Sequence, residues 1–251
     1  MPEFDDLTLH NKEIQENLEF WGKKPLLKQI YFDFYRKISR CLIDLPGLHT
    51  IEIGSGIGNI NEVIPDCIRT DLFANPWIDQ LENAYDLSFE NNSVANIILF
   101  DIFHHLKYPE TAFNEFKRVL SSEGRIIIFE PYMSLLGLFI FGLLHHEPLG
   151  LTKTIEFKAP EGWQAEDSSY YAAQGNASRI FFRRKYKSFL TDWHVDKVVK
   201  MSAISYVASG GYSKPQLYPD KALPILKVID RFCDLFPSIF ATRVLVVLKK
   251  R

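Results

Sequence analysis

Residues 50–59 of this chain read TIEIGSGIGN, a short apolar run with one acid followed by glycines at three alternate positions. The apolar run predicts a buried strand over 49–53. The glycines predict a tight turn in which a ligand can approach the backbone closely. The apolar spacing that follows predicts a helix over 57–64, which would offer free N–H groups at its start. In open α/β sheets, a strand, turn and helix of this kind form the usual site for nucleotides and related ligands.

The rest of the chain alternates between strand-like and helix-like patterns. Strands are expected at 49–53, 67–70, 94–100, 125–129, 195–206 and 242–248, and helices at 25–45, 57–64, 76–81, 109–120, 176–190 and 221–236. Residues 94–100 are almost continuously apolar, as expected for a central parallel strand covered on both faces. The alternation therefore predicts an α/β fold in which a doubly wound parallel sheet has right-handed crossovers.

Two regions stand outside this alternation within a single predicted domain, 1–251. Residues 1–24 are polar and expected to be irregular, and with the following helix they form an N-terminal cover, 1–47. Residues 132–175 are interpreted as an insertion or lid over the cleft. Its apolar run, Met133 to Leu144, is too short to cross a bilayer, which takes roughly 20 residues. It could be a buried packing helix, a lid over an apolar acceptor or a contact with a membrane surface.

Composition restricts the classes of partner and compartment. The 251 residues carry a formal net charge of −2 and a sequence pI of about 6.4, which does not favour a broad nucleic-acid surface. The three cysteines lie far apart, so no disulfide framework is predicted and a reducing compartment suits them. The first residues are acidic and lack an apolar core, so no secretory signal is predicted and we expect a cytoplasmic protein. The oligomeric state stays open.

The spacing of the glycines separates two ligand classes. A dinucleotide fingerprint requires G-x-G-x-x-G, and Asn59 stands where its third glycine belongs. The G-x-G-x-G spacing therefore disfavours a nicotinamide dinucleotide. Acidic residues follow several predicted strands, and the carboxyl ends of parallel strands share one edge of the sheet. We expect those residues to line one crevice; they are Glu52, Asp71, Asp101 and Glu130.

Five motifs in order resemble the class I S-adenosylmethionine-dependent methyltransferases, and more closely their type 11-like small-molecule branch. The matching segments are 52–58, Asp71-Leu72, 83–89 (NAYDLSF), 100–106 (FDIFHHL) and 116–126. The resemblance is strong over about 48–131. It implies a Rossmann-like methyltransferase fold with a mostly parallel seven-stranded sheet, helices on both faces and an insertion after the fifth strand. It also implies S-adenosylmethionine as the cofactor.

By the same resemblance, the cofactor-binding residues are Glu52, Gly54, Ser55, Gly56, Gly58, Asp71, Leu72, Asn83, Ala84 and Asp101. The carboxylate of Asp71 can accept hydrogen bonds from both ribose hydroxyls through its two oxygens. Glu52 would hold the turn or the ammonium end of the cofactor. Asn83 stands where the family usually has aspartate, so a charged contact to the adenine amine is expected to be lost.

The acceptor side is expected to include His104, His105, Tyr132, His146 and Glu147, and the acceptor to be a small molecule, a sugar or a lipid-linked compound. Methyl transfer mainly requires alignment of the two reactants and exclusion of water, so no catalytic residue is assigned. The run His145-His146-Glu147 could recruit a metal, but adjacent histidines usually point apart and no third ligand is evident there, so no metal site is predicted. A catalytically silent cofactor-binding or scaffold protein is the alternative, and an NAD-dependent oxidoreductase a lesser one.

Overall fold

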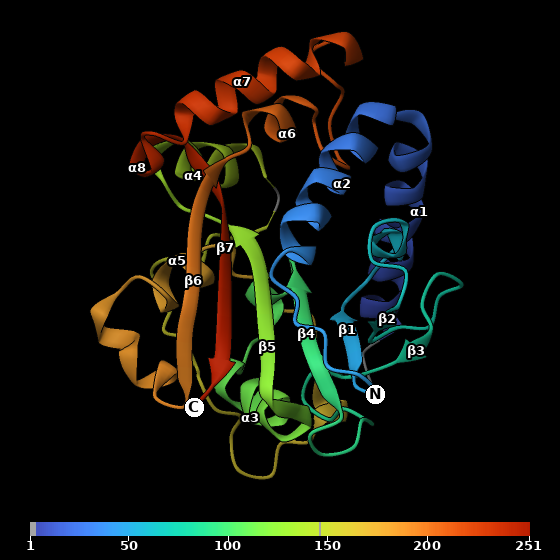
Figure 1. Ribbon diagram of the computed structural model, residues 1–251, viewed down its shortest axis with the longest axis vertical. Coiled ribbons are helices and arrows are strands. Elements are labelled where there is room, and N and C mark those ends of the chain that lie inside the picture. Colours follow the sequence, from blue (N-terminus) through green and yellow to red (C-terminus); the bar gives the residue numbers. More distant parts are fainter. Residues whose placement is uncertain (1–3, 146) are drawn as a thin grey trace.

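The computed structural model describes residues 4–145 and 147–251, which surround one twisted seven-stranded sheet (Figure 1). The strand order is β3-β2-β1-β4-β5-β7-β6, and only β7 runs against its neighbours. The strands are β1 (His49–Ile53), β2 (Cys67–Asp71), β3 (Gln80–Leu81), β4 (Val94–Phe100), β5 (Leu120–Pro131), β6 (Trp193–Ser202) and β7 (Ala241–Lys250). The predicted fold class, a mostly parallel seven-stranded sheet, is confirmed.

Helices cover both faces of the sheet, as predicted. They are α1 (Phe4–Lys23), α2 (Pro25–Ser39), α3 (Pro109–Val119), α4 (Leu135–Phe139), α5 (Asn176–Ile180), α6 (Ile204–Ala208), α7 (Leu223–Cys233) and α8 (Pro237–Phe240). Successive side chains of a strand point to opposite faces. In β4, Ile97 and Leu99 therefore join the core under α3, whereas Ile98 and Phe100 join the core under α2. This two-sided burial explains why 94–100 is apolar throughout.

Two local predictions near the glycine turn were wrong. The predicted helix over 57–64 is only a 3₁₀ turn, η1 (Asn59–Glu62), because Gly58 enters it in a left-handed conformation and Pro65 follows closely. The predicted helix over 76–81 is replaced by the edge strand β3. Asp79 accepts hydrogen bonds from both the backbone N–H and the guanidinium of Arg69, and this pairing holds 80–81 alongside β2.

Three further boundaries differ from the prediction. Residues 1–24 were expected to be irregular, but α1 is a 20-residue helix that begins at Phe4. The predicted helix over 176–190 is divided into α5 and the 3₁₀ helix η5 (Arg184–Leu190). The predicted strand over 195–206 ends at Ser202, because the Asp230 carboxylate accepts the N–H of Ile204 at 2.6 Å and caps the start of α6.

The apolar run at 133–144 forms α4 and a π-helical turn, η3 (Ile140–Leu144). Much of this run faces outward: Leu135 is 65% exposed and Leu143 is 72% exposed. Its interpretation as a buried packing helix is therefore wrong, although Gly137 and Phe141 are buried. Within 4–145 and 147–251, no helix combines the length and the hydropathy that crossing a bilayer requires.

Candidate active site

A cleft with a volume of about 580 Å³ opens at the carboxyl ends of β1, β2 and β4. This is the edge at which ligands bind in open α/β sheets. The predicted residues that line it are Glu52, Gly54, Ser55, Gly56, Asp71, Leu72, Asn83, Ala84, Asp101, His104, His105 and Glu147. Helix α1 contributes further walls, as do the segments 140–145 and 163–174. The structure therefore brings together most of the side chains that the motifs singled out.

The glycine turn after β1 is built on left-handed backbone. Gly54, Gly56 and Gly58 have φ values of 70°, 53° and 64°, a region that residues with a side chain rarely adopt. The N–H of Gly56 donates to Oδ2 of Asp71 at 3.0 Å, which ties the turn to the end of β2. A Cβ at Gly58 would lie 2.2 Å from the carbonyl oxygen of Trp77. Gly58 lies outside the cleft, and its role is to allow this close backbone contact.

Glu52 is buried at the end of β1, beneath the turn. Burial is the main reason that the pKa of Glu52 rises to about 8. Its Oε2 atom is buried and has no hydrogen-bond partner among the described residues. A buried carboxyl oxygen without a hydrogen-bond donor destabilises the folded protein. A cationic ligand group at this point would donate to that oxygen and remove the penalty.

Asp71 is shared between the turn and the N-terminal helix. Oδ1 accepts the N–H of Phe73 at 3.3 Å and lies 3.4 Å from Nε2 of His10, which belongs to α1. The ring of His10 also lies 4.7 Å from the ring of Phe73. Helix α1 thus covers the cleft at Asp71; the sequence predicted a cover over 1–47 but neither this helix nor the contact of His10. The helical spacing of Ile14, Leu18 and Trp21 is the sequence pattern that could have predicted this helix.

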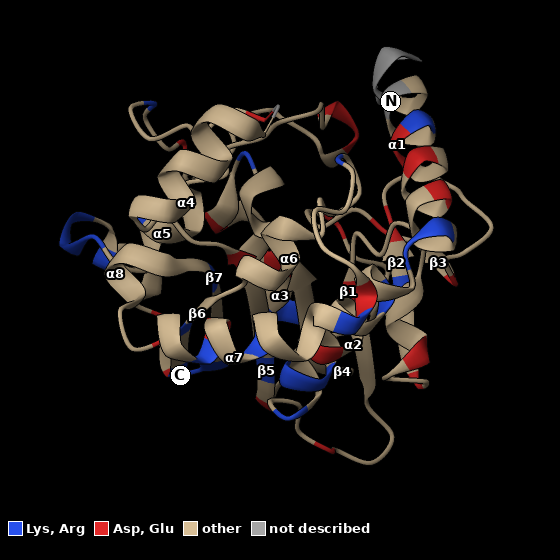
Figure 2. Ribbon diagram, turned by 90° about the horizontal axis from the view of Figure 1, so that it is seen from above, with Lys and Arg blue, Asp and Glu red and all other residues tan. Residues whose placement is uncertain are grey.

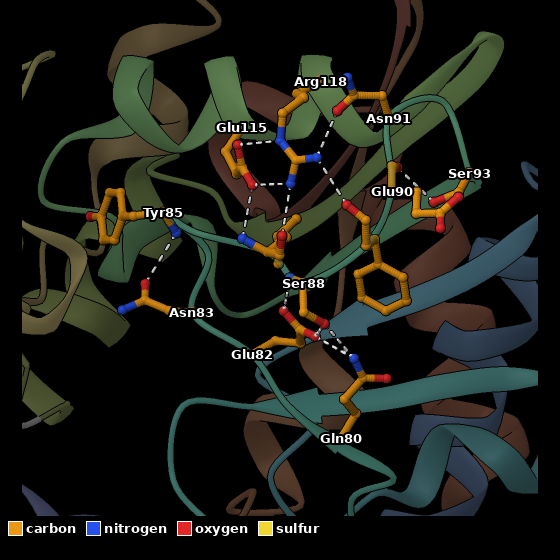
Figure 3. Close-up of polar contacts among 12 residues, drawn as sticks. Gln80, Glu82, Asn83, Tyr85, Ser88, Glu90, Asn91, Ser93, Glu115 and Arg118 are labelled. Carbon is orange, nitrogen blue, oxygen red and sulfur yellow. Dashed lines mark hydrogen bonds and ion pairs between the residues drawn. The ribbon is translucent and has the colours of Figure 1, made fainter.

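The segment 83–89 is fixed by polar contacts with α3 (Figure 3). Glu115 accepts the N–H of Leu87 at 2.8 Å, and Arg118 donates to the carbonyl of Leu87 at 2.7 Å. Asn83 donates through Nδ2 to the carbonyl of Ala165 at 2.8 Å. A carboxylate could not make this last bond, so the departure of Asn83 from the family's aspartate fits its link to the 132–175 segment.

Asp101 follows β4 with a left-handed φ of 56° and pairs with the buried Arg243 of β7. Burial raises the pKa of Asp101, and the positive charge of Arg243 opposes that rise. The guanidinium carbon of Arg243 also lies 4.7 Å from the ring centre of Tyr206. Arg243 lines the cleft but was not predicted, since no local pattern relates it to a residue 142 positions earlier.

His104 and His105 lie side by side at the acceptor end of the cleft. Nδ1 of His104 is 2.7 Å from Oε2 of Glu130, and its Nε2 is 3.3 Å from Oε2 of Glu147. Burial alone would lower the pKa of His104, but the two carboxylates outweigh burial and raise it to about 10. Burial and the charge of His104 lower the pKa of His105 to about 4. The pKa of Glu147 is held well below its usual range, against the effect of burial, by the hydrogen bond and charge of His104.

The remaining predicted acceptor residues divide into two cases. Tyr132 lies outside the cleft that the described residues form: its ring packs against Phe182, with the ammonium group of Lys200 4.7 Å from its centre. This position does not support its predicted contact with an acceptor, which stays a prediction. His146 lies outside the described residues. The expectation that His145 and His146 point apart therefore stays a prediction. His104 and His105, by contrast, have ring centres 4.1 Å apart, and both face Glu147.

Comparison with known proteins agrees with this geometry. Residues 51–128 match the family model described as a methyltransferase domain, of type 11, which confirms the predicted resemblance. No curated protein matches the chain. Among solved structures, a methyltransferase from Thermotoga maritima, described as a possible histamine N-methyltransferase, is 14% identical with a TM-score of 0.54, over 95% of this chain and 99% of that one.

Two other solved structures share the fold. Geranyl diphosphate C-methyltransferase from Streptomyces coelicolor is 12% identical with a TM-score of 0.51, over 87% of this chain and 76% of that one. A methyltransferase from Archaeoglobus fulgidus that depends on S-adenosylmethionine is 12% identical with a TM-score of 0.51, over 89% of this chain and 94% of that one. At these identities, the structures establish the fold of the chain.

Proposed function

We propose that this protein, whose residues 51–128 belong to the methyltransferase domain family, transfers a methyl group from S-adenosylmethionine to a small acceptor that has an apolar part. One observation carries the proposal: a single cleft joins the left-handed glycine turn, the carboxylate of Asp71 and the unpartnered carboxyl oxygen of Glu52. These three features meet the needs of a ligand with a ribose, an ammonium group and a part that lies against backbone.

The residues present fit this cofactor. Asp71 uses Oδ2 for the N–H of Gly56, and the lone pairs that remain on its two oxygens can accept ribose hydroxyls. Glu52 supplies a buried acceptor for an ammonium group. Asn83 and Ala84 line the cleft where the family places the adenine. When bound, adenosylmethionine supplies a methyl group on a positively charged sulfur, and the protein's part is to hold the acceptor in line with it.

The acceptor side of the cleft is largely apolar. Ile140, Phe141 and Leu144 of η3 line it together with the aromatic side chains of Trp163 and Tyr170. Helix α1 and the segment 163–174 cover the cleft and reduce the access of water, which favours a displacement at a cationic centre. An acceptor with an apolar chain or ring would fill this space, and its nucleophilic oxygen or nitrogen would lie near His105.

The decisive experiment is calorimetry of the purified chain with adenosylhomocysteine and, in parallel, with NAD⁺. We expect adenosylhomocysteine to bind at one site per chain and NAD⁺ to show no heat. Binding of NAD⁺ alone would replace the proposal with the oxidoreductase alternative. Adenosylhomocysteine binding without methyl transfer, across a panel of apolar alcohols, amines and lipid-linked sugars, would instead favour a silent cofactor-binding protein.

Cofactor affinity should rise with pH between about 6 and 8. In the free protein, the pKa of Glu52 is raised to about 8, so its carboxyl group is mostly protonated at pH 7. An ammonium group beside Glu52 favours the carboxylate, so binding lowers this pKa and releases a proton. Calorimetry in buffers with different ionisation enthalpies measures that proton directly.

The Glu52→Gln variant is the control for this pH dependence. It keeps the shape of the side chain but cannot ionise, so its affinity should be lower than that of the wild type at pH 8 and flat across the same range. A wild-type affinity that does not change between pH 6 and pH 8 would remove Glu52 from the ammonium site.

An exposed apolar surface adjoins the acceptor end of the cleft, and we assign it to contact with a lipid surface. The surface consists of Leu135, Leu138, Phe139, Leu143, Leu144, Ile225, Val228, Ile229, Phe232, Leu235, Phe236 and Ile239. Helix α4 packs against α8, α7 leads directly into α8 along the chain, and Figure 2 shows α4 without charged residues. Because η3 both lines the cleft and contributes to this surface, a lipid-linked acceptor could pass from one to the other.

Charged residues on this surface should prevent binding to vesicles. We expect the double variant Leu143→Asp/Phe232→Asp to lose at least about tenfold in affinity for phospholipid vesicles, because each aspartate puts a charge where apolar area would be buried. The control is Leu81→Asp on β3, at the other end of the sheet, where the side chain is 55% exposed. Equal sedimentation of all three proteins with vesicles would exclude a lipid surface as the partner.

A further inference from the structure

Three side chains at the acceptor end of the cleft present metal-ligating atoms to one another. They belong to His104, His105 and Glu147, and their ligand atoms all lie within 4.8 Å. Nε2 of His104 is 3.3 Å from one carboxylate oxygen of Glu147, and Nε2 of His105 is 3.6 Å from the other. Ligands bound to one ion at about 2.1 Å lie roughly 3–3.5 Å apart, so both of these nitrogen–oxygen distances are close to the spacing that a shared ion requires.

The other nitrogen of each ring is held by a hydrogen-bond acceptor. Nδ1 of His104 contacts the buried carboxylate of Glu130 at 2.7 Å, and Nδ1 of His105 contacts the carbonyl oxygen of Tyr171 at 2.8 Å. A carbonyl oxygen can only accept, so His105 carries its proton on Nδ1 and its Nε2 lone pair faces Glu147. Metal-binding histidines are typically oriented in this way, by a carboxylate or a backbone carbonyl on the far nitrogen.

Gln174 provides a second, independent observation at the same place. Its side chain is buried, and its Oε1 atom has no hydrogen-bond partner among the described residues. Its Nε2 lies 3.3 Å from Nε2 of His104 and also contacts Glu147. Rotation of the amide group by 180° brings Oε1 to the position of Nε2, near His104 and Glu147, where it could serve as a fourth ligand. A bound cation would thus satisfy a buried oxygen that the protein leaves without a donor.

We propose that His104, His105 and Glu147 bind one divalent ion of the Zn²⁺ type, with Gln174 as an adjustable fourth ligand. Two imidazole nitrogens and one carboxylate suit Zn²⁺ and its transition-metal neighbours, whereas Mg²⁺ and Ca²⁺ prefer sites made of oxygen alone. The three ligands line the cleft, so a remaining coordination position faces the acceptor. Such an ion would polarise an acceptor oxygen; this role rests on the proposed methyl transfer, whereas the binding of the ion does not.

Calorimetry with Zn²⁺ on the tag-free full chain, after treatment with a chelator, tests the site. We expect one ion per chain and no heat with Mg²⁺. The variants His105→Ala and Glu147→Gln should each weaken Zn²⁺ binding by about 100-fold or more, and Glu130→Gln, which affects only orientation, by about 10–100-fold. The matched control is His194→Ala, an exposed histidine on β6, which should bind like the wild type.

Two further readouts keep the result interpretable. Co²⁺ should give a visible d–d spectrum with the wild type and lose it with Glu147→Gln. Adenosylhomocysteine affinity, measured on the same samples, should be unchanged in Glu147→Gln, so failure of the ion site and failure of the cofactor site can be told apart. If Zn²⁺ does not bind, or if folded Glu147→Gln binds it as well as the wild type, the cluster is a buried ion-pair network without a metal.

Discussion

Replacing Asp71 with alanine will lower the affinity for adenosylhomocysteine by about 100-fold or more and reduce methyl transfer in proportion. Asp71 is 7% exposed at the end of β2 and lines the cleft beside the glycine turn. Each hydrogen bond to a charged acceptor contributes about 1.5–3 kcal/mol, and a ribose offers two hydroxyls. The lower limit for two such bonds, about 3 kcal/mol, corresponds to roughly 100-fold in the dissociation constant.

The Asp71→Asn variant separates binding from support of the turn. An amide oxygen can still accept the N–H of Gly56, which Asp71 accepts at 3.0 Å. This variant would therefore keep the turn in place but lack the charge. We expect its affinity for adenosylhomocysteine to lie between that of the wild type and that of Asp71→Ala.

The matched control for both variants is Asp192→Ala, which removes an exposed aspartate paired with Lys117 far from the cleft. Calorimetry with adenosylhomocysteine measures all four proteins. Wild-type affinity in folded Asp71→Ala would refute the assignment of the ribose contact, and with it the proposed cofactor geometry.

Replacing Arg243 with methionine will destabilise the protein by about 3 kcal/mol, as measured by urea unfolding at pH 7. The guanidinium is buried against Tyr206 and pairs with Asp101, and its removal leaves a carboxylate in the cleft wall without a counter-charge. Removing one partner of a fully buried ion pair costs about 3–5 kcal/mol. We place the effect near the lower limit because the Asp101 side chain keeps 28% of its exposure.

The double variant Asp101→Asn/Arg243→Met identifies the cause. Asparagine tolerates the left-handed backbone that Asp101 adopts and carries no charge, so most of the lost stability should return. Arg243→Met alone should also lose less stability at pH 4 than at pH 7, because protonation removes the unpaired charge. A double variant that unfolds as early as Arg243→Met would show that packing of the long side chain, and not its charge, is what matters.

The part of the site that could be predicted from the sequence consists of residues at strand ends. Glu52, Asp71 and Asp101 each lie at the end of a strand whose apolar pattern is local, and parallel strands bring their carboxyl ends to one edge. The local apolar pattern of each of the three strands was therefore enough to place these side chains in one crevice. The glycine spacing likewise excluded a dinucleotide fingerprint without any knowledge of the fold.

The unpredicted part depends on contacts between distant segments. His10 reaches Asp71 only because α1 is a helix, and α1 is mostly polar, with Ile14 and Trp21 buried by packing on other elements. Arg243 meets Asp101 because β7 lies between β5 and β6, an arrangement that no local periodicity encodes. Glu147 faces two histidines that lie some forty positions earlier in the chain, so their ligand-like arrangement emerges only after folding.

The antiparallel pairing of β5 with β7 limits how this protein can be divided into modules. Residues 51–128 match the methyltransferase domain model, yet β5 pairs with β7 from Arg125 to Pro131, and Arg243 of β7 completes the wall around Asp101. A chimera that exchanged the acceptor region after Pro131 for that of a relative would also replace this wall. The exchangeable acceptor unit must therefore end before β7. Residues 132–240 can be swapped between relatives only if β7 of the host is kept.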